Sequence, residues 1–143
     1  MPDTGDKAPE FVGRNYDGQP IAISAYAGKV VVVSFWALWC PPCRKELPLL
    51  EGIQQTAGKQ RLQVIAVNIE SLDTFQRIAR KMTSLHILIG SDSGGEARRA
   101  YGVNGIPHMV IIGKSGEIVR VNRGYSEEGV DKVIRDLNQA LAQ

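Results

Sequence analysis

The sequence contains two cysteines, Cys40 and Cys43, and they are separated by two prolines. Cysteines three positions apart close too short a loop to stabilise a fold, because stabilisation by a disulfide grows with loop length. A purely structural disulfide is therefore a poor explanation of this pair. Reversible thiol–disulfide chemistry is the best explanation, provided that the motif follows a strand and opens a helix.

Metal binding is the main alternative for the pair. A structural zinc site usually has four Cys or His ligands in closely spaced pairs. His86 and His108 are the only other candidates of these types, and both lie far downstream without such spacing. We therefore expect neither a metal nor a cofactor. Because thiolates and imidazole suit Cu(I), a copper-binding module made of Cys40, Cys43 and His108 stays an alternative.

The segments around the motif have the required order. The β-branched run Val30–Phe35 is typical of a strand buried on both faces, and hence central in an α/β sheet. From Pro41 the apolar residues recur at helical spacing until Gly58. Cys40 thus lies at a helix N-terminus, where unpaired amides and the helix dipole lower a thiol pKa. We expect Cys40 to be an exposed nucleophile.

Cys43 lies one helical turn further on and is expected to be the shielded, resolving thiol. In such a pair the first thiolate attacks a substrate disulfide, and the second then displaces the substrate. Pro41 and Pro42 remove two amides that could otherwise donate to the Cys40 sulfur. We therefore expect the dithiol to be more reducing than a motif with free amides.

The remaining elements follow from periodicity and turn residues. They are a hairpin from Phe11–Val12 and Ile21–Ile23, a strand at Leu62–Val67, a helix from Leu72 to Met82 capped by Ser71, a short strand at His86–Ile89, a short helix to Tyr101 opened by a capping box at Ser93–Glu96, strands at Pro107–Ile112 and Ile118–Val121, and a C-terminal helix from Val130 to Leu141. This order predicts one three-layer α/β domain over residues 1–143.

Composition and charge exclude several function classes. With 17 Lys and Arg against 15 Asp and Glu, the net charge is only +2, and Arg98-Arg99 is a pair rather than a stripe. We therefore expect no nucleic-acid binding. The longest apolar run, Val30–Trp39, is much shorter than the ~20 residues of a membrane span. The N-terminus has no signal-peptide pattern, so we expect either a cytosolic protein or a mature exported domain.

Taken together, the motifs resemble those of the thioredoxin superfamily, and within it the TlpA/ResA/CcmG group of extracytoplasmic thiol–disulfide oxidoreductases. The resemblance covers essentially the whole chain. It is carried by the residues Gly5–Phe11, Gly28-Lys29 before the valine run, Phe35–Pro48 around the two cysteines, Tyr101–Val103 and Gly105–Pro107. The resemblance implies a thioredoxin-like fold with a central mixed sheet, flanking helices and an N-terminal hairpin extension.

The resemblance also implies a substrate site. Pro107 is expected to be cis and to pack against the Cys40–Cys43 pair. Because proline cannot donate a ladder hydrogen bond, the backbone of Ile106 is left to pair with an extended substrate segment. The residues expected to contact substrate are Trp39, Pro41, Pro42 and Ile106, whereas Trp36 is expected to point into the core.

Two positions depart from the related families. Ser34 stands where cytosolic thioredoxins carry a buried Asp that accepts a proton from the inner thiol. The group resemblance implies that Glu70, just after the second strand, takes this role if it is buried beside Cys43, where burial would raise its pKa. The alternative is a solvent-facing loop residue.

His108 stands where the resembling group usually has Thr after the cis-proline. It is either a residue that tunes the cysteine pKa or a partly buried, hydrogen-bonded strand residue.

These observations favour an enzyme, a thiol–disulfide oxidoreductase that acts mainly as a reductase. The resemblance implies a periplasmic or otherwise extracytoplasmic location in a bacterium, with any membrane anchor outside this sequence. The implied partners of this soluble and, we expect, monomeric domain are an upstream thiol electron donor and oxidised cysteine pairs of exported proteins, such as apocytochromes in cytochrome c maturation or copper-site assembly proteins. An oxidase or isomerase remains an alternative. A peroxidase is disfavoured, because Ala37 stands where peroxiredoxins carry Thr.

Overall fold

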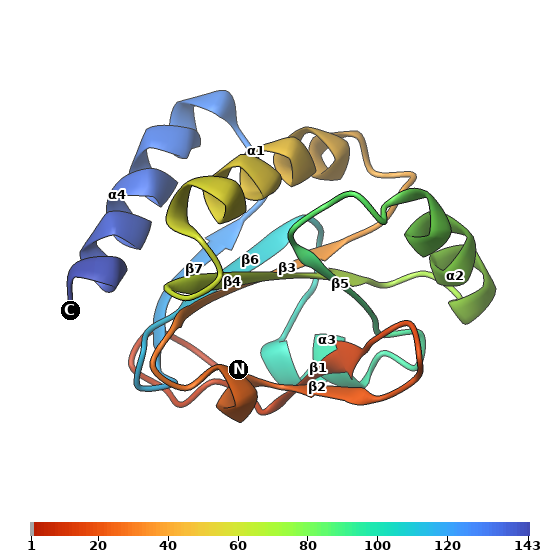
Figure 1. The fold of residues 1–143 in the computed structure, drawn as a ribbon, viewed down its shortest axis with the longest axis horizontal. Coiled ribbons are helices and arrows are strands. Elements are labelled where there is room, and N and C mark those ends of the chain that lie inside the picture. Colours follow the sequence, from red (N-terminus) through yellow and green to blue (C-terminus); the bar gives the residue numbers. More distant parts are fainter. Residues whose placement is uncertain (1) are drawn as a thin grey trace.

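A computed structural model describes residues 2–143 and contains a seven-stranded mixed sheet with the strand order β2-β1-β5-β4-β3-β6-β7 (Figure 1). The strands are β1 (Phe11–Arg14), β2 (Pro20–Ala22), β3 (Val30–Trp36), β4 (Leu62–Asn68), β5 (Leu88–Ser91), β6 (His108–Ile112) and β7 (Ile118–Arg123). The α-helices are α1 (Pro41–Ala57), α2 (Leu72–Lys81), α3 (Glu96–Tyr101) and α4 (Val130–Ala142), and short 3-10 helices span Ile23–Tyr26 and Glu127–Gly129. This is the thioredoxin-like architecture that the sequence predicts, including the N-terminal hairpin.

The centre of the sheet is β3 with its neighbours β4 and β6. Every residue of β3 and β4 is buried. β3 runs parallel to β4 and antiparallel to β6. The unbroken β-branched run in β3 is therefore explained by burial on both faces of the strand, as expected.

The sheet separates two apolar cores. On one face, α1, α2 and α4 cover a core that contains both cysteines together with Trp36 and Met109 (Figure 1). On the other face, α3 and the first 3-10 helix cover a second core around Phe35 and Tyr101. Successive residues of a strand point to opposite faces, so neighbours along β3 and β6 belong to different cores.

The topology brings three chain segments to one end of the sheet. Trp36 at the end of β3 pairs with Asn68 at the end of β4, and Phe35 pairs with His108 at the start of β6. The segments that follow β3 and β4 and the segment that precedes β6 therefore emerge side by side. They carry Cys40, Glu70 and Pro107, respectively.

The strand expected at His86–Ile89 is displaced to Leu88–Ser91. The reason is the carboxylate of Glu51 on α1, which accepts hydrogen bonds from the amides of His86 (2.8 Å) and Ile87 (3.1 Å). Those amides are therefore not available for a strand ladder, and pairing with β4 begins only at Leu88.

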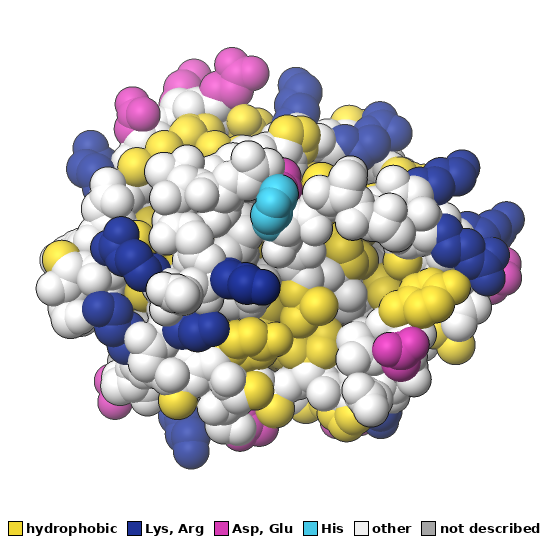
Figure 2. All heavy atoms as spheres, in the orientation of Figure 1, with side chains coloured by type: hydrophobic (Ala, Val, Ile, Leu, Met, Phe, Trp, Pro, Cys, Tyr) yellow, Lys and Arg dark blue, Asp and Glu magenta, His cyan; other side chains and the backbone are white. Residues whose placement is uncertain are grey.

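The surface shows no concentration of positive charge on the face that Figure 2 displays. Lys and Arg side chains are spread around its edge and centre among polar and acidic groups. Within residues 2–143, none of the helices combines the length and the apolar character that crossing a membrane would require.

The expected capping box at Ser93–Glu96 is wrong. The residue before α3 is Gly95, which has no side chain to cap the helix. Instead, the buried carboxylate of Asp92 accepts hydrogen bonds from the amides of Ala97 (3.0 Å) and Arg98 (2.9 Å). Two of the unpaired amides at this helix end are thus satisfied by a residue one position earlier than expected.

Substitution at these two positions distinguishes the two caps. We expect Asp92→Ala to lower the free energy of unfolding by about 1–3 kcal/mol, because it leaves buried amides without an acceptor. Ser93→Ala is expected to change it by less than about 0.5 kcal/mol, as is usual for exposed sites. Urea unfolding of both variants measures the difference, and an equal loss in Ser93→Ala would restore the capping box.

Candidate active site

Cys40 and Cys43 form a disulfide at the junction between β3 and α1, as the sequence predicts. Cys40 is the N-cap of α1, and its sulfur accepts a hydrogen bond from the amide of Cys43 at 3.3 Å. Pro41 and Pro42 occupy the first two helical positions and have no amide hydrogen. Of the first three helical residues, only Cys43 therefore donates to the sulfur.

Both sulfur-bearing residues are buried in the disulfide state. Cys40 is 3% exposed and Cys43 is 1% exposed, so the expectation of an exposed Cys40 is wrong for this state. Ile106 packs against the core that holds the pair, and its carbonyl oxygen lies 3.8 Å from the Cys40 sulfur. The two cysteines differ in their surroundings. Cys40 faces the segment before β6, whereas Cys43 is the first residue on the buried face of α1.

The Ile106–Pro107 peptide bond is cis, which confirms the expectation. Pro107 is buried and its carbonyl oxygen accepts a hydrogen bond from Gly124. Ile106 is half-buried at the same edge. Its position next to Cys40, together with the missing amide of Pro107, fits the expected backbone site for an extended segment.

The rim around the disulfide is apolar and exposed. Trp39 is 66% exposed and Leu38 is 46% exposed, whereas Trp36 is buried as expected. Pro41 and Pro42 are also exposed. The surface formed by these residues is therefore mostly hydrocarbon, and the carbonyl of Ile106 lies next to the Cys40 sulfur.

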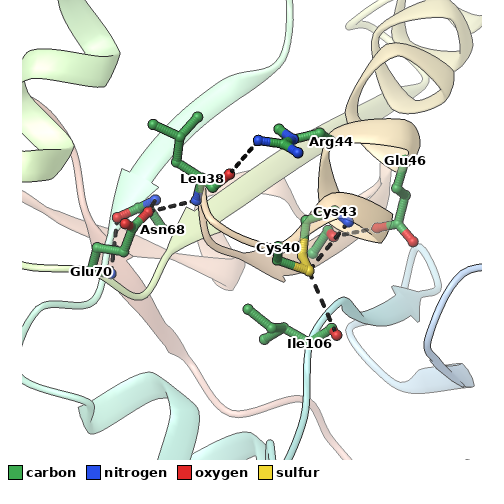
Figure 3. Close-up of a disulfide and its surroundings, with 9 residues drawn as sticks. Leu38, Cys40, Cys43, Arg44, Glu46, Asn68, Glu70 and Ile106 are labelled. Atoms are coloured by element: carbon green, nitrogen blue, oxygen red, sulfur yellow. Dashed lines mark hydrogen bonds between the residues drawn. A yellow bond between two sulfur atoms is a disulfide. The ribbon is translucent and has the colours of Figure 1, made fainter.

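Glu70 is half-buried and follows β4. It contacts the loop between β3 and α1 at Leu38, on the side away from Cys43 (Figure 3). Its carboxylate accepts hydrogen bonds from the amide of Leu38 (2.7 Å) and from the side chain of Asn68 (2.9 Å). The structure thus engages Glu70 with the backbone before the motif and does not place its carboxylate against Cys43.

A different carboxylate, Glu46, lies on the cysteine side, and sequence reasoning missed it. Glu46 is 2% exposed and accepts a hydrogen bond of 2.6 Å from the hydroxyl of Ser34. Figure 3 shows its side chain to the right of Cys43, on the same helix and on the side opposite to Glu70. Burial raises the pKa of Glu46 to about 7, although the hydrogen bond from Ser34 acts in the opposite direction. A buried acid with this pKa is suited to exchange a proton near neutral pH.

The sequence did contain a signal for this residue. Cys43, Glu46 and Leu50 follow one another at spacings of three and four, which places all three on the same face of α1. A carboxylate on the apolar face of an amphipathic helix is unusual and calls for a partner. Glu46 also lines a cavity of about 200 Å³, large enough for several waters.

His108 lies on the opposite face of the sheet from the disulfide. Its ring packs edge-on against Phe35, a residue of the α3-side core, at a centroid distance of 6.1 Å. Burial, and secondarily the positive charge of Arg123, lower the pKa of His108 to about 4. It is fully buried, and its Nε2 atom has no hydrogen-bond partner, unlike the partly buried, hydrogen-bonded residue considered above. The structure does not bring it to the sulfurs.

The pKa of Glu46 predicts a pH-dependent stability. An ordinary Glu titrates near ~4.3 in the unfolded chain, so the native state holds a proton that the unfolded state releases between about pH 4.5 and 7. Glu46 therefore contributes most to stability below pH 4.5, and this contribution is lost as the pH rises through about 7. The loss amounts to about 3 kcal/mol.

The variant Glu46→Gln keeps an oxygen acceptor for Ser34 and removes the titration. We expect its unfolding free energy, relative to that of the oxidised wild type, to rise by about 3 kcal/mol between pH 4.5 and 7.5. Guanidinium unfolding at both pH values measures this difference, and other titrating groups cancel in the comparison. A difference that does not change with pH would contradict the assignment.

Comparison with known proteins adds the family. The model of the AhpC/TSA family matches residues 4–121. Thiol-disulfide oxidoreductase ResA of Bacillus thuringiensis subsp. konkukian (strain 97-27) is 30% identical over 134 residues, which are 93% of this chain and 78% of that protein. Among solved structures, a candidate DsbE thiol:disulfide interchange protein from Chlorobium tepidum is 28% identical with a TM-score of 0.87, and the match covers 99% of both chains.

An exposed lipoprotein thioredoxin from Streptococcus pneumoniae strain TIGR4 is also similar. It is 26% identical with a TM-score of 0.73, and the match covers 92% of this chain and 99% of that one. The fold, the motif at the start of α1 and these matches agree with one another. The chain therefore belongs to the AhpC/TSA family and, within it, to the ResA-like thiol–disulfide oxidoreductases.

Proposed function

We propose that this protein reduces disulfides in other proteins, with Cys40 as the nucleophile and Cys43 as the resolving thiol. The observation that carries the proposal is the position of Cys40 at the N-cap of α1, next to the carbonyl of Ile106. In the reduced protein the amide of Cys43 and the positive end of the helix stabilise a Cys40 thiolate. The Cys43 thiol has no comparable position.

The reaction proceeds by two exchanges. The Cys40 thiolate attacks one sulfur of a substrate disulfide, and the other substrate sulfur leaves as a thiolate that takes up a proton. Cys43 then loses its proton and attacks the Cys40 sulfur, which releases the second substrate thiol and forms the Cys40–Cys43 disulfide. The substrate gains two electrons and two protons, and a thiol donor must supply two electrons for the next cycle.

Glu46 is the group best placed to take the proton of Cys43. It follows Cys43 by one helical turn, and the hydroxyl of Ser34 orients its carboxylate. Its pKa of about 7 lies close to that of a thiol, so transfer in either direction costs little. The adjoining cavity gives the proton a route to solvent. In this proposal Glu46 takes the proton-exchanging role that the family resemblance implies for Glu70 if Glu70 lies beside Cys43.

Substrate recognition in this proposal uses backbone pairing and apolar contact. The carbonyl of Ile106 accepts a hydrogen bond from an extended substrate segment, while Pro107 leaves the neighbouring ladder position open. Trp39, Pro41 and Pro42 supply exposed apolar area next to the sulfur. This site selects for an extended chain around the target cysteine more than for a particular sequence.

The alternatives receive less support. An oxidase or isomerase would use the same residues and would differ in reduction potential, so the measurement below decides between them. The copper module needs a third ligand, but His108 packs on the other face of the sheet. Within residues 2–143 no cluster of three or more His, Cys, Asp or Glu side chains could hold a metal ion.

The proposed location is extracytoplasmic, as for the exposed lipoprotein thioredoxin that the chain resembles. In such a location the substrates are oxidised cysteine pairs of exported proteins, including apocytochromes or copper-site assembly proteins. The protein then requires an upstream thiol donor, because each cycle leaves its own disulfide oxidised.

Single-cysteine variants test the roles of the two thiols. We expect Cys43→Ser to accumulate a mixed disulfide with insulin as a test substrate, because attack by Cys40 proceeds and resolution does not. Cys40→Ser is expected to form at least tenfold less of this adduct. Non-reducing electrophoresis with mass spectrometry measures both, and preferential trapping by Cys40→Ser would reverse the assignment.

The reduction potential tests the direction of electron flow. We expect a value near or below about −220 mV, whereas a value near −120 mV would make the protein a disulfide donor. Pro42 lies at the second helical position, from which an amide can reach the N-cap side chain. Pro42→Ala should therefore stabilise the thiolate and raise the potential by about 20–30 mV, if one hydrogen bond contributes about 1 kcal/mol.

Pro41→Ala is the matched control for that substitution. It restores an amide at the first helical position. Of the two amides counted from the sequence, this one does not reach the cap side chain, so the potential should stay within about 10 mV. Equilibration against a dithiol buffer followed by thiol alkylation measures all three proteins. Equal shifts in the two variants would refute the role given to the amide at position 42.

A further inference from the structure

The loop between β3 and α1 presents two apolar side chains to solvent. Leu38 and Trp39 are large apolar residues next to the disulfide in the chain, with 46% and 66% of their surface accessible. They directly precede Cys40 in the chain. They therefore lie on the same exposed loop as the residue that a protein substrate has to reach.

Two hydrogen bonds hold the backbone of this loop, one to the amide and one to the carbonyl of Leu38. The amide of Leu38 donates to the carboxylate of Glu70 at 2.7 Å, and the carbonyl of Leu38 accepts from the guanidinium of Arg44 at 3.4 Å. The amide of Cys40 donates to the carbonyl of Ala37 at 3.2 Å, which closes the turn. Contacts from two other segments of the chain thus fix the position of Leu38.

Glu70 is itself fixed by Asn68, which is completely buried at the end of β4. The side-chain amide of Asn68 donates to the carboxylate oxygen that receives the Leu38 amide, at 2.9 Å. The backbone amide of Glu70 donates to the side-chain oxygen of Asn68, also at 2.9 Å. Figure 3 shows Asn68 and Glu70 together below Leu38, away from the cysteines.

We propose that Glu70 is a positioning residue, which holds Leu38 and Trp39 as a fixed apolar platform for protein substrates. This inference rests on the proposed reductase function and adds the residue that prepares its binding surface. A charged acceptor forms a stronger hydrogen bond to an amide than a neutral one, and it keeps the loop ordered before the substrate arrives. Glu70 exchanges no proton with either cysteine in this role.

The choice of variants separates positioning from proton transfer. Glu70→Gln removes the titratable group but retains an oxygen that can accept from both Leu38 and Asn68. Glu70→Ala removes the acceptor altogether. Glu128→Ala, at an exposed position with no side-chain hydrogen bond in the structure, controls for the loss of a negative charge.

Insulin and hydroxyethyl disulfide serve as a large and a small substrate. For Glu70→Ala we expect about a tenfold rise in KM for insulin, because the loop loses one hydrogen bond to a charged group and has to be ordered when the substrate binds. The kcat should stay within about twofold of the wild type. The rate with hydroxyethyl disulfide and the pH profile of Cys40 alkylation should follow the wild type. Glu70→Gln should recover the KM of the wild type to within about twofold, and Glu128→Ala should not differ from it.

Amide hydrogen exchange reports the position of the loop directly. The amide of Leu38 should be protected in the wild type and in Glu70→Gln, and it should exchange at least tenfold faster in Glu70→Ala. An unchanged KM in Glu70→Ala would overturn the proposal. Equal damage in Glu70→Gln and Glu70→Ala, with a shifted alkylation profile, would instead assign proton transfer to Glu70.

Failure of the proposed function gives a different result. If the wild type itself turns over neither insulin nor the small disulfide, the reductase function is wrong and the substrate platform is wrong with it. If the wild type is active and only the contrast between Glu70→Ala and Glu70→Gln is absent, the reductase function stands and the positioning role alone is refuted.

Discussion

The site depends on the pairing of β3 with a parallel strand on one side and an antiparallel strand on the other. This pairing makes the ends of β3 and β4 and the start of β6 meet at one edge of the sheet. Cys40 can then lie at a helix N-terminus while the carbonyl of Ile106 approaches its sulfur from a distant part of the chain. Neither segment would form this arrangement alone, because the helix end supplies the positive electrostatic potential and the opposite segment supplies the carbonyl beside the sulfur.

A buried polar residue, Asn68, connects the two sides of this edge. Its side chain holds Glu70, and its backbone carbonyl accepts the amide of Asp92 at 2.8 Å. Asp92 in turn caps α3, the helix that leads into the segment containing Ile106. An unpaired buried polar group costs about 1–3 kcal/mol, so every member of this chain of contacts constrains the next. The loop that carries Cys40 and the helix before the opposite segment are thereby held in one arrangement.

Local patterns in the sequence predicted most helices and strands. They failed where a contact with a residue far away in the chain determines the local structure. The valine run and the position of Cys40 at the helix start could be predicted because each depends on its own neighbours. The beginning of β5 could not, because the carboxylate of Glu51 on another helix takes the amides of His86 and Ile87. The burial of Glu46 could have been predicted from helical spacing. The sheet face to which His108 points could also have been predicted, because His108 alternates with Met109 along β6. That Glu70 contacts Leu38 depends on two loops meeting in space, which no single segment encodes.

The burial of the disulfide affects how fast the oxidised form of the protein can be reduced. Thiol–disulfide exchange requires in-line access to a sulfur, and Cys40 and Cys43 together expose almost none. Small thiols from solution therefore meet hydrocarbon and backbone rather than sulfur. Attack on Cys40 in the oxidised form therefore requires movement of the groups that cover its sulfur. The oxidised form is therefore reduced at a rate that depends on how readily this cover opens, while the position of the redox equilibrium is unaffected.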